Sequence, residues 1–267
     1  MTLMKDRPLD SSQLDIHMAS PVDIIRILTV NTHKGFTALN RRFILPELRE
    51  AVRAVSADVV FLQEVLGMHE KHALRFHDWP QIPQYEFLAD SIWPDFAYGQ
   101  NAVYPAGDHG NALLSKFPIL SHENLDISIA GPERRGLLHS VLEIPGHPKV
   151  HAICVHLGLR EAHRQQQLQL LCELVNSLPS QAPVIVAGDF NDWRMKACDK
   201  LLQDANLYEV FTKRHGELAR TFPARWPLLR LDRIYARNIE VTRAKILGHK
   251  PWTHLSDHLP LAVELRL

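Results

Sequence analysis

The feature that most constrains this chain is a pattern that occurs several times: a run of apolar residues is followed directly by polar side chains that can bind a metal. The first run, at residues 24–30, is rich in β-branched residues and leads into Asn31. A second run at 58–63 leads into Glu64, and a third leads into Asp189. Continuous apolar runs of this length predict strands that are buried on both faces in a layered domain.

Between these runs, the spacing of apolar residues predicts further elements. Helical spacing predicts an amphipathic helix that begins near Pro46, a long helix over about residues 161–178 and a short one near 196–205. Prolines interrupt the aromatic residues of 79–104, which predicts short strands and irregular loops there. The remaining strands are expected at 110–118, 231–235 and 261–265, with a hairpin formed by 137–144 and 150–155.

The order of these elements favours one domain. Strands and helices are mixed without strict βαβ alternation, and no repeat, low-complexity tract or interdomain linker separates them. This pattern favours a single α/β or α+β sandwich over a doubly wound nucleotide-binding sheet. Residues 1–22 are interpreted as a flexible N-terminal leader, and residues 23–267 as the folded domain.

The composition excludes a strong global electrostatic field. Thirty Lys and Arg residues offset 30 Asp and Glu residues, so the net charge attracts the chain neither to nucleic acid nor to an anionic membrane. A zero net charge does not exclude a local basic groove. Three cysteines without paired spacing argue against a disulfide framework or a cysteine zinc site and favour a reducing compartment. Because no secretory segment and no membrane-spanning apolar run is found, we expect a cytoplasmic protein without a transmembrane segment.

The polar groups at the ends of the predicted strands share one chemical character. If the strands lie side by side, these groups converge on one rim of the domain. Carboxylate and amide oxygens with few histidines suit Mg²⁺ or Mn²⁺ better than zinc. Such a set can direct water at a phosphate ester. The groups are Asn31, Glu64, His156, Asp189 with Asn191, Asp232, and Asp257 with His258.

Seven short motifs extend this interpretation over nearly the whole chain. NTHKG, LQEV, GNALLSK, VHLG, GDFND, RLDRIY and SDHLPL occur within about residues 24–265. In this order they resemble the endonuclease/exonuclease/phosphatase superfamily, which includes exonuclease III-like nucleases, deoxyribonuclease I, neutral sphingomyelinases and inositol polyphosphate 5-phosphatases. The sequence is most similar to an uncharacterised bacterial branch. The resemblance implies a DNase I-like four-layer α/β/β/α sandwich, in which two mixed β-sheets are flanked by helices and residues 23–267 form the catalytic domain.

The resemblance also implies roles at the metal and the attacking water. Glu64 is expected to be the main carboxylate ligand of Mg²⁺ or Mn²⁺, with Asn31 and Asp257 at or near the ion. Asp189 is expected to orient or deprotonate the attacking water, and Asn191 to support the scissile phosphate. Without the resemblance, the residue types indicate metal-assisted hydrolysis of a phosphate ester but do not assign these individual roles, because Asp and Asn also favour ordinary turns.

Further roles are implied around the phosphate. Asp232 is expected to hold the ring of His258, which would stabilise the transition state or transfer a proton; a simple ion pair of Asp232 with Arg230 or Arg233 is the alternative. His156 is expected to donate a hydrogen bond to a phosphate oxygen. Weaker candidates for phosphate contacts are His33, Lys34, Asn111 and Arg135.

Together these features predict a metal-dependent phosphodiesterase that uses direct water attack without a covalent enzyme intermediate. The substrate stays open between nucleic acid, a phospholipid headgroup and a small phosphodiester, and no obligate protein partner is evident. A DNA-repair or general nuclease is the alternative enzyme, although no Lys/Arg-rich insertion for gripping a DNA backbone is found. A catalytically silent binding module with the same fold is the alternative from another class, which the retention of Glu64, Asp189 and His258 argues against.

Overall fold

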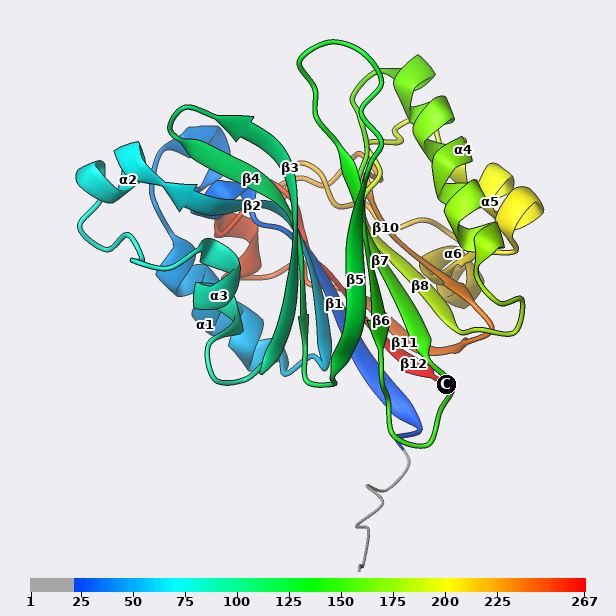
Figure 1. Ribbon diagram of the computed structural model, residues 1–267. Helices are drawn as coiled ribbons and strands as arrows, with labels where there is room; N and C mark the ends of the chain where they lie inside the picture. Colours follow the sequence, from blue (N-terminus) through cyan, green and yellow to red (C-terminus); the bar gives the residue numbers. More distant parts are fainter. Residues whose placement is uncertain (1–21) are drawn as a thin grey trace, which may run out of the picture.

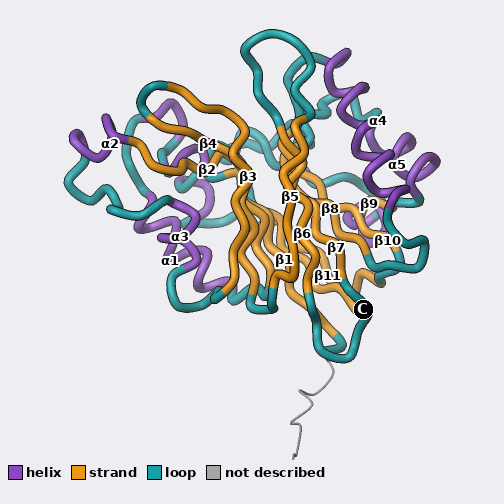
Figure 2. Tube along the Cα trace, viewed as in Figure 1, coloured by secondary structure: helices purple, strands orange, loops and turns teal. Residues whose placement is uncertain are grey.

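The structure is a computed structural model, and residues 22–267 are described. Two six-stranded β-sheets lie face to face, and helices cover their outer faces (Figures 1 and 2). The predicted four-layer α/β/β/α sandwich of two mixed sheets is therefore confirmed. The leader predicted for residues 1–22 lies outside the described residues except for its last residue.

The first sheet has the strand order β11-β12-β1-β2-β4-β3. Its central pair, β1 and β2, is parallel, and the other pairs are antiparallel. The parallel pair places the carboxyl ends of β1 and β2 at the same edge of the sheet. The bounds are β1 Ile24–Asn31, β2 Val59–His69, β3 Asp95–Tyr104, β4 Gly107–Ser115, β11 Glu240–Ile246 and β12 Leu261–Arg266.

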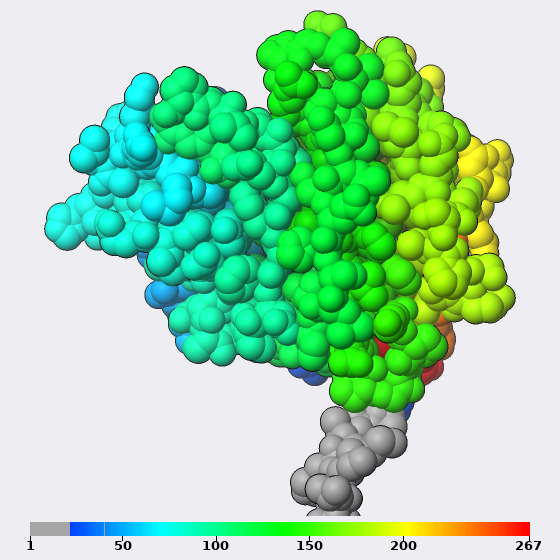
Figure 3. All heavy atoms as spheres, in the orientation of Figure 1, coloured from blue at the N-terminus to red at the C-terminus, as the bar shows by residue number. Residues whose placement is uncertain are grey.

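The second sheet has the order β5-β6-β7-β8-β10-β9. Here β7 and β8 form the parallel pair, and β6 with β7 forms the predicted hairpin. Strands β5 and β6 cover the middle of the face seen in Figure 3, where they are green. The bounds are β5 Ile119–Asp126, β6 Gly136–Leu142, β7 Val150–His156, β8 Val184–Asp189, β9 Tyr208–Glu209 and β10 Asp232–Arg237.

Alternation along β1 explains why its sequence is apolar almost throughout. Ile25 and Ile27 enter the core between the two sheets, whereas Leu28 and Val30 enter the core beneath the helices. Because successive side chains of a strand point to opposite faces, a strand covered on both sides needs an apolar residue at nearly every position. The buried strand predicted at residues 24–30 is confirmed.

Helices close the two outer layers. α1 (Leu45–Val55), α2 (Glu70–Arg75) and α3 (Gln84–Ala89) lie on the side of the first sheet, and α4 (Glu161–Ser177) and α5 (Ala197–Ala205) cover the second sheet (Figure 1). α6 (Val210–His215) packs against β10 and β11. The helices predicted from Pro46, at 161–178 and at 196–205 correspond to α1, α4 and α5. Within residues 22–267, the structure contains no helix with the length and apolarity needed to cross a bilayer; the cytoplasmic location stays a prediction.

Three predictions differ from the structure. The strand expected to end at Gln63 continues as β2 to His69, so Glu64 lies inside a strand. The segment 79–104, predicted as short strands and loops, contains α3 and the ten-residue strand β3. β5 and β11 were not expected, because their side chains are largely exposed and carry no apolar alternation. An edge strand is fixed by backbone pairing to one neighbour, which leaves little signal in its sequence.

Gly188 allows β8 to approach β7 closely, one residue before Asp189. It has φ +148°, and a Cβ atom added there would lie 2.0 Å from the backbone oxygen of Val155. Since that oxygen belongs to the neighbouring strand, relief of the clash requires the two strands to separate. Gly216 differs, because it has φ +80° but nothing within 4 Å of an added Cβ.

We expect Gly188→Ala to lower the free energy of unfolding by at least about 2 kcal/mol, because it combines overpacking with backbone strain. Gly216→Ala is the matched control and should cost only about 1 kcal/mol, the usual penalty of a left-handed conformation for a residue with a Cβ. Urea denaturation of both variants measures the difference. Equal losses would show that the contact between β7 and β8 is not the constraint at Gly188.

A pair of histidines lies between β6 and β7, away from the polar strand ends. His139 Nε2 lies 2.9 Å from His151 Nδ1, and the two rings are stacked. Burial, and secondarily His151, lowers the pKa of His139 to about 4. Burial also lowers the pKa of His151. Between pH 6.5 and about 4, the unfolded chain therefore binds more protons here than the folded chain does, so stability falls as the pH falls.

Replacing His139 of this pair should reduce the loss of folding stability at acidic pH. Compared with the wild-type chain, His139→Gln should lose less stability between pH 7.5 and pH 4.5, by about 1 kcal/mol after allowance for partial exposure of the ring. Urea midpoints measured across this range provide the test. His122→Gln, at an exposed position of β5, should keep the wild-type slope. An unchanged slope in His139→Gln would rule out a contribution from the pair.

Candidate active site

The strand register places the predicted site residues in two rows. In the second sheet, His156 pairs with Asp189 and Asp189 pairs with Asp232, so one row crosses β7, β8 and β10. In the first sheet, Asn31 pairs with Gln63, the residue before Glu64. Each row lies at the edge where the carboxyl ends of the parallel strands meet, and the stacking of the sheets brings the two rows together.

Asn31 joins the two rows. Its Nδ2 donates to Asp189 Oδ2 at 3.2 Å and lies 3.5 Å from Glu64 Oε1. Its Oδ1 accepts from the backbone N–H of His33 at 3.0 Å, which fixes the orientation of the amide. The hydroxyl of Ser256 donates to the backbone oxygen of Asn31 at 2.7 Å and anchors the loop that follows η3 (Trp252–His254). Asn31 is 2% exposed, so this cross-sheet contact is shielded from water.

An irregularity in β2 directs Glu64 toward this centre. The pairing of β2 with β4 shifts between Leu62 and Val65, and Glu64 has φ +56°. A bulge of this kind changes the direction of a side chain within a strand, and positive φ at a non-glycine residue is costly. The Thr32 hydroxyl bonds at 3.0 Å to the backbone oxygen of Glu64 and holds the bulge against the end of β1.

Asp232, His258 and Asp189 form a buried polar chain. His258 Nδ1 lies 2.9 Å from Asp232 Oδ2, and His258 Nε2 lies 3.8 Å from Asp189 Oδ2. Burial by itself would lower the pKa of His258, but Asp232 and Asp189 outweigh it and raise that pKa to about 10. The ring is therefore a cation at neutral pH. The predicted contact of Asp232 with His258 is present, and the buried ion pair of the neighbouring Arg233 is instead with Asp192, at 3.8 Å.

Asp189 combines burial with a tight turn. Burial raises the pKa of this carboxyl to about 6, although the charge of His258 acts to lower it. Its Oδ1 accepts from the backbone N–H of Asn191 at 2.9 Å, and Asn191 has the left-handed φ of +48° that asparagine tolerates. The Asn191 amide also donates to Leu157 O at 2.9 Å, which ties the turn after β8 to the end of β7.

His156 lies on the other side of Asp189. Its Nε2 is 3.6 Å from Asp189 Oδ2. Burial, followed by the charge of Arg135, holds the pKa of His156 well below its usual value, so this contact is polar rather than an ion pair. Arg135 is held in place by Glu133 at 2.9 Å and by Leu157 O at 3.2 Å.

His33 lies between two carboxylates. Its Nδ1 is 3.2 Å from Asp257 Oδ1 and 4.0 Å from Glu64 Oε2. The hydrogen bond to Asp257 raises the pKa of His33 against the effect of burial. Burial alone would raise the pKa of Asp257, but His33 and His258 outweigh it and lower that pKa. The two acids thus face a common point that already attracts a positive charge.

Two weaker candidates lie apart from these contacts. Asn111 is fully buried between the sheets, where its Nδ2 donates to Gly136 O at 3.1 Å and its Oδ1 has no hydrogen-bond partner among the described residues. Lys34 follows His33 in the turn η1 (His33–Gly35), but it lines a separate cavity. Neither makes a hydrogen bond or ion pair with the other predicted site residues.

Two groups of side chains offer ligand atoms for a cation. Asp189, Asp232 and His258 have ligand atoms within 4.8 Å of one another. This group fits a cation poorly, because a protonated imidazole has no lone pair to give and His258 is bound to Asp232. Glu64 and Asp257 fit better: they are half-buried acids on either side of one point, and hard oxygen ligands suit Mg²⁺ or Mn²⁺.

Three supporting groups were not singled out from the sequence. Thr32 and Ser256 belong to the motifs NTHKG and SDHLPL, so those motifs were the signal that could have identified them. His109 on β4 gave no such signal. Burial, followed by the charge of Lys34, lowers its pKa to about 4.

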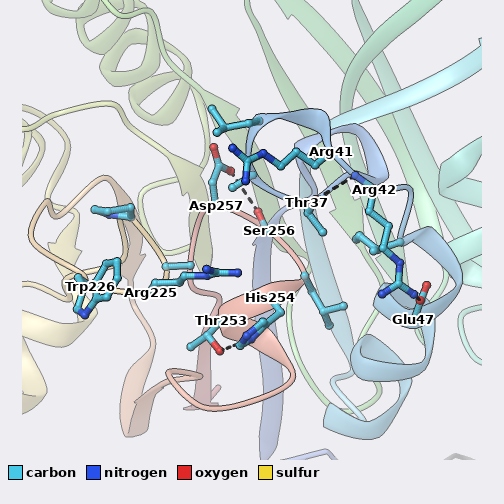
Figure 4. Close-up of a pocket in the computed structure, with 16 residues that line it drawn as sticks. Thr37, Arg41, Arg42, Glu47, Arg225, Trp226, Thr253, His254, Ser256 and Asp257 are labelled. Carbon is cyan, nitrogen blue, oxygen red and sulfur yellow. Dashed lines mark hydrogen bonds and ion pairs between the residues drawn. The ribbon is translucent and has the colours of Figure 1, made fainter.

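A cavity of about 550 Å³ opens beside this centre. Ser256 and Asp257 form part of its wall, and the loop after β1 and residues 223–226 form much of the rest. In Figure 4, Arg225 points into the cavity, Arg41 and Asp257 form part of its lining, and Trp226 lies at the far side. The cavity therefore leads away from Asp257 toward arginine side chains.

Comparison with known proteins agrees with this architecture. YbhP, an uncharacterised protein of Escherichia coli K12, is 59% identical over 243 residues, which cover 91% of this chain and 96% of that protein. An endonuclease/exonuclease/phosphatase from Beutenbergia cavernae superposes with a TM-score of 0.73 at 19% identity, over 92% of this chain and 72% of that chain. TDP2 from D. rerio, solved in complex with a single-strand DNA product, gives a TM-score of 0.68 at 18% identity, over 91% and 99%.

The two structural likenesses show the fold alone at these identities. The family assignment has a separate basis, because the model of the Endonuclease/Exonuclease/phosphatase family matches residues 28–258. Members of this family are generally hydrolases that act on phosphoesters, and they generally use a divalent metal. The matched range includes Asn31, Glu64, Asp189 and His258. The chain belongs to the Endonuclease/Exonuclease/phosphatase family.

Proposed function

We propose that this chain is a divalent-metal-dependent phosphodiesterase that hydrolyses a P–O ester bond by direct attack of water. One observation carries the proposal: the ring of His258 and the buried Asp189 face each other, with Nε2 and Oδ2 3.8 Å apart, and Asn31 links Asp189 to the carboxylate of Glu64. A proton acceptor, a proton donor and a pair of neighbouring carboxylates are the groups that this reaction needs.

Glu64 and Asp257 are the proposed holders of the metal, with Asn31 beside them. Mg²⁺ or Mn²⁺ bound there would supply positive charge to the phosphate and so favour the build-up of negative charge in the transition state. Asn31 keeps Glu64 and Asp189 at fixed positions through its Nδ2. His33 balances the two acids, because its ring contacts both.

The proposed proton movements use Asp189 and His258. Asp189 orients the attacking water and takes its proton, a task for which a carboxyl pKa raised toward neutrality is suited. His258 donates from Nε2 to a phosphate oxygen, while Asp232 holds the ring through Nδ1. His156 and Asn191 are the further proposed contacts to the phosphate. All of these groups hold or move protons, and none forms a covalent bond with phosphorus.

The neighbouring cavity offers space for an organic ester group of the substrate. A diester carries an organic group on each side of its phosphate, and both groups need space. The cavity of about 550 Å³ begins at Asp257 and contains apolar side chains together with Arg225. One ester group can occupy it while the phosphate stays beside Asp189. The proposal leaves open whether that group belongs to a nucleic acid, a phospholipid headgroup or a small diester.

The first test is turnover of bis-p-nitrophenyl phosphate with Mg²⁺ or Mn²⁺. Asp189→Asn and His258→Ala should each lower kcat by about 10²- to 10⁴-fold, because each removes a proton-transfer group. Treatment with EDTA should abolish turnover, and added Mg²⁺ or Mn²⁺ should restore it. Asp199→Asn on the exposed face of α5 and His122→Ala on β5 are the matched controls and should keep the wild-type rate.

The same experiment separates an enzyme from a binding module that retains the fold. Circular dichroism should show an unchanged fold in each variant, so that a lost rate reports chemistry. If the wild-type chain, Asp189→Asn and His258→Ala share one background rate with either metal, the enzyme is excluded and the binding module is favoured.

A nuclease is the second candidate, and it is favoured by the likeness in fold to TDP2, which was solved with a single-strand DNA product. The zero net charge argues against tight, non-specific binding to DNA. Abasic-site and plasmid DNA, incubated with Mg²⁺ at 50 and 200 mM salt, test this function. Absence of cleavage at stoichiometric enzyme would argue strongly against the nuclease and would leave the other phosphodiesters as substrates. Cleavage by catalytic amounts that weakens strongly with salt would establish the nuclease instead.

A further inference from the structure

A second cavity, of about 350 Å³, lies beside the proposed active site, and its lining is unusual in charge. Cationic side chains and histidines share it with aromatic and apolar residues, and none of the described residues that line it is an acid. Its polar lining consists of Lys34, Arg41, His69, His72, Arg75 and Tyr104. A cavity with this lining favours an anion.

The positive charges of this cavity have no carboxylate partners among the described residues, although Arg75 lies over the ring of Phe76. Among the described residues, no carboxylate forms an ion pair with Lys34, Arg41 or Arg75, whereas the neighbouring Arg42 is paired with Glu47. Burial lowers the pKa of both His69 and His72, so these rings are neutral at pH 7 and act as hydrogen-bonding groups. The cavity therefore holds three unneutralised cations and several polar groups of the kind that bind phosphate oxygens.

A buried amide fixes two walls of the cavity. The side chain of Gln84, from α3, is fully buried. Its Nε2 donates to Lys34 O at 3.0 Å, and its Oε1 accepts from the backbone N–H of Leu66 at 3.0 Å. Lys34 and Leu66 both line the cavity. The walls are thus held in place before a ligand arrives, which lowers the entropic cost of binding.

One turn joins this cavity to the proposed active site. His33 and Lys34 are consecutive residues of η1, and both have positive φ. The His33 ring contacts Asp257 and Glu64, whereas Lys34 lines the cavity. Because consecutive Cα atoms are about 3.8 Å apart, two anionic groups of one molecule can reach both places.

We propose that this cavity is a subsite for a phosphomonoester group, and that the preferred substrate is a phosphodiester carrying such a second phosphate near the scissile one. The inference rests on the proposed function, because it assigns the scissile phosphate to the site at Asp189. The second phosphate would bind to Lys34, Arg41 and Arg75, with His72 and Tyr104 as hydrogen-bonding partners. Nucleotides and phosphorylated sugar alcohols can both supply this chemistry.

Calorimetry on the full chain tests the subsite without requiring turnover. The Asp189→Asn variant with Mg²⁺ is titrated with two matched pairs of ligands: thymidylyl-thymidine with and without a 5′-phosphate, and glycerophosphoinositol with and without a phosphate on the ring. In at least one pair, the phosphorylated member should bind about tenfold more tightly or better, as expected for charge-assisted hydrogen bonds. The pair that shows the preference identifies the source of the phosphate.

Variants show whether the preference comes from this cavity. Arg75→Gln and His72→Gln, made in the Asp189→Asn background, should each reduce the preference to threefold or less. Lys71→Gln is the matched control, since Lys71 is an exposed residue of the same helix and does not line the cavity. It should keep the full preference.

Equal affinities within both pairs, no binding of either phosphorylated ligand, or an undiminished preference in Arg75→Gln and His72→Gln would each overturn the subsite. These outcomes differ from failure of the proposed function, which is a loss of metal-dependent diester turnover in the wild-type chain. A chain can fail either test while passing the other.

Discussion

The hydrogen bond from Asn31 to Asp189 is the contact on which the rest of the site depends, because it joins the two sheets at the edge where their parallel strands end. Each sheet alone supplies only some of the candidate active-site residues. The first sheet provides Glu64, and the second provides His156, Asp189 and Asp232. Face-to-face packing of the sheets brings these sets together. A change in the strand register of either sheet would turn side chains to the opposite face and separate the sets.

Burial of so many polar groups has an electrostatic cost that the arrangement offsets locally. Asp189, Asp232 and His258 are almost inaccessible to water, so an unpaired charge among them would be strongly unfavourable. The cation at His258 lies between the two acids and is stabilised by both, which raises its pKa to about 10. Asp189 still keeps a pKa raised to about 6, because burial opposes its ionisation. Because burial disfavours its ionised form, the Asp189 carboxyl group can exchange a proton near neutral pH.

The order of the motifs allowed the four-layer sandwich to be predicted by resemblance, and the apolar runs correctly placed Asn31, Asp189 and Asp232 at the ends of strands. Apolar spacing did not predict edge strands whose side chains are exposed, nor segments with an irregular backbone. β5 and β11 have exposed side chains, and Glu64 points to the centre through a bulge inside β2 rather than from a strand end. The placement of His33 against Asp257 joins residues 224 positions apart through a turn with positive φ, for which apolar spacing gives no signal.

The turn at His33 and Lys34 links the chemistry of the centre to the choice of substrate. Positive φ at two consecutive non-glycine residues is unfavourable, so surrounding contacts must hold the turn. Gln84 bonds to the backbone of Lys34 on one side, and Asp257 binds the His33 ring on the other. A ligand phosphate on Lys34 would stabilise the same backbone that presents His33 to Glu64 and Asp257. The strained turn is therefore the physical element through which occupation of the cationic cavity would order the groups around the scissile phosphate.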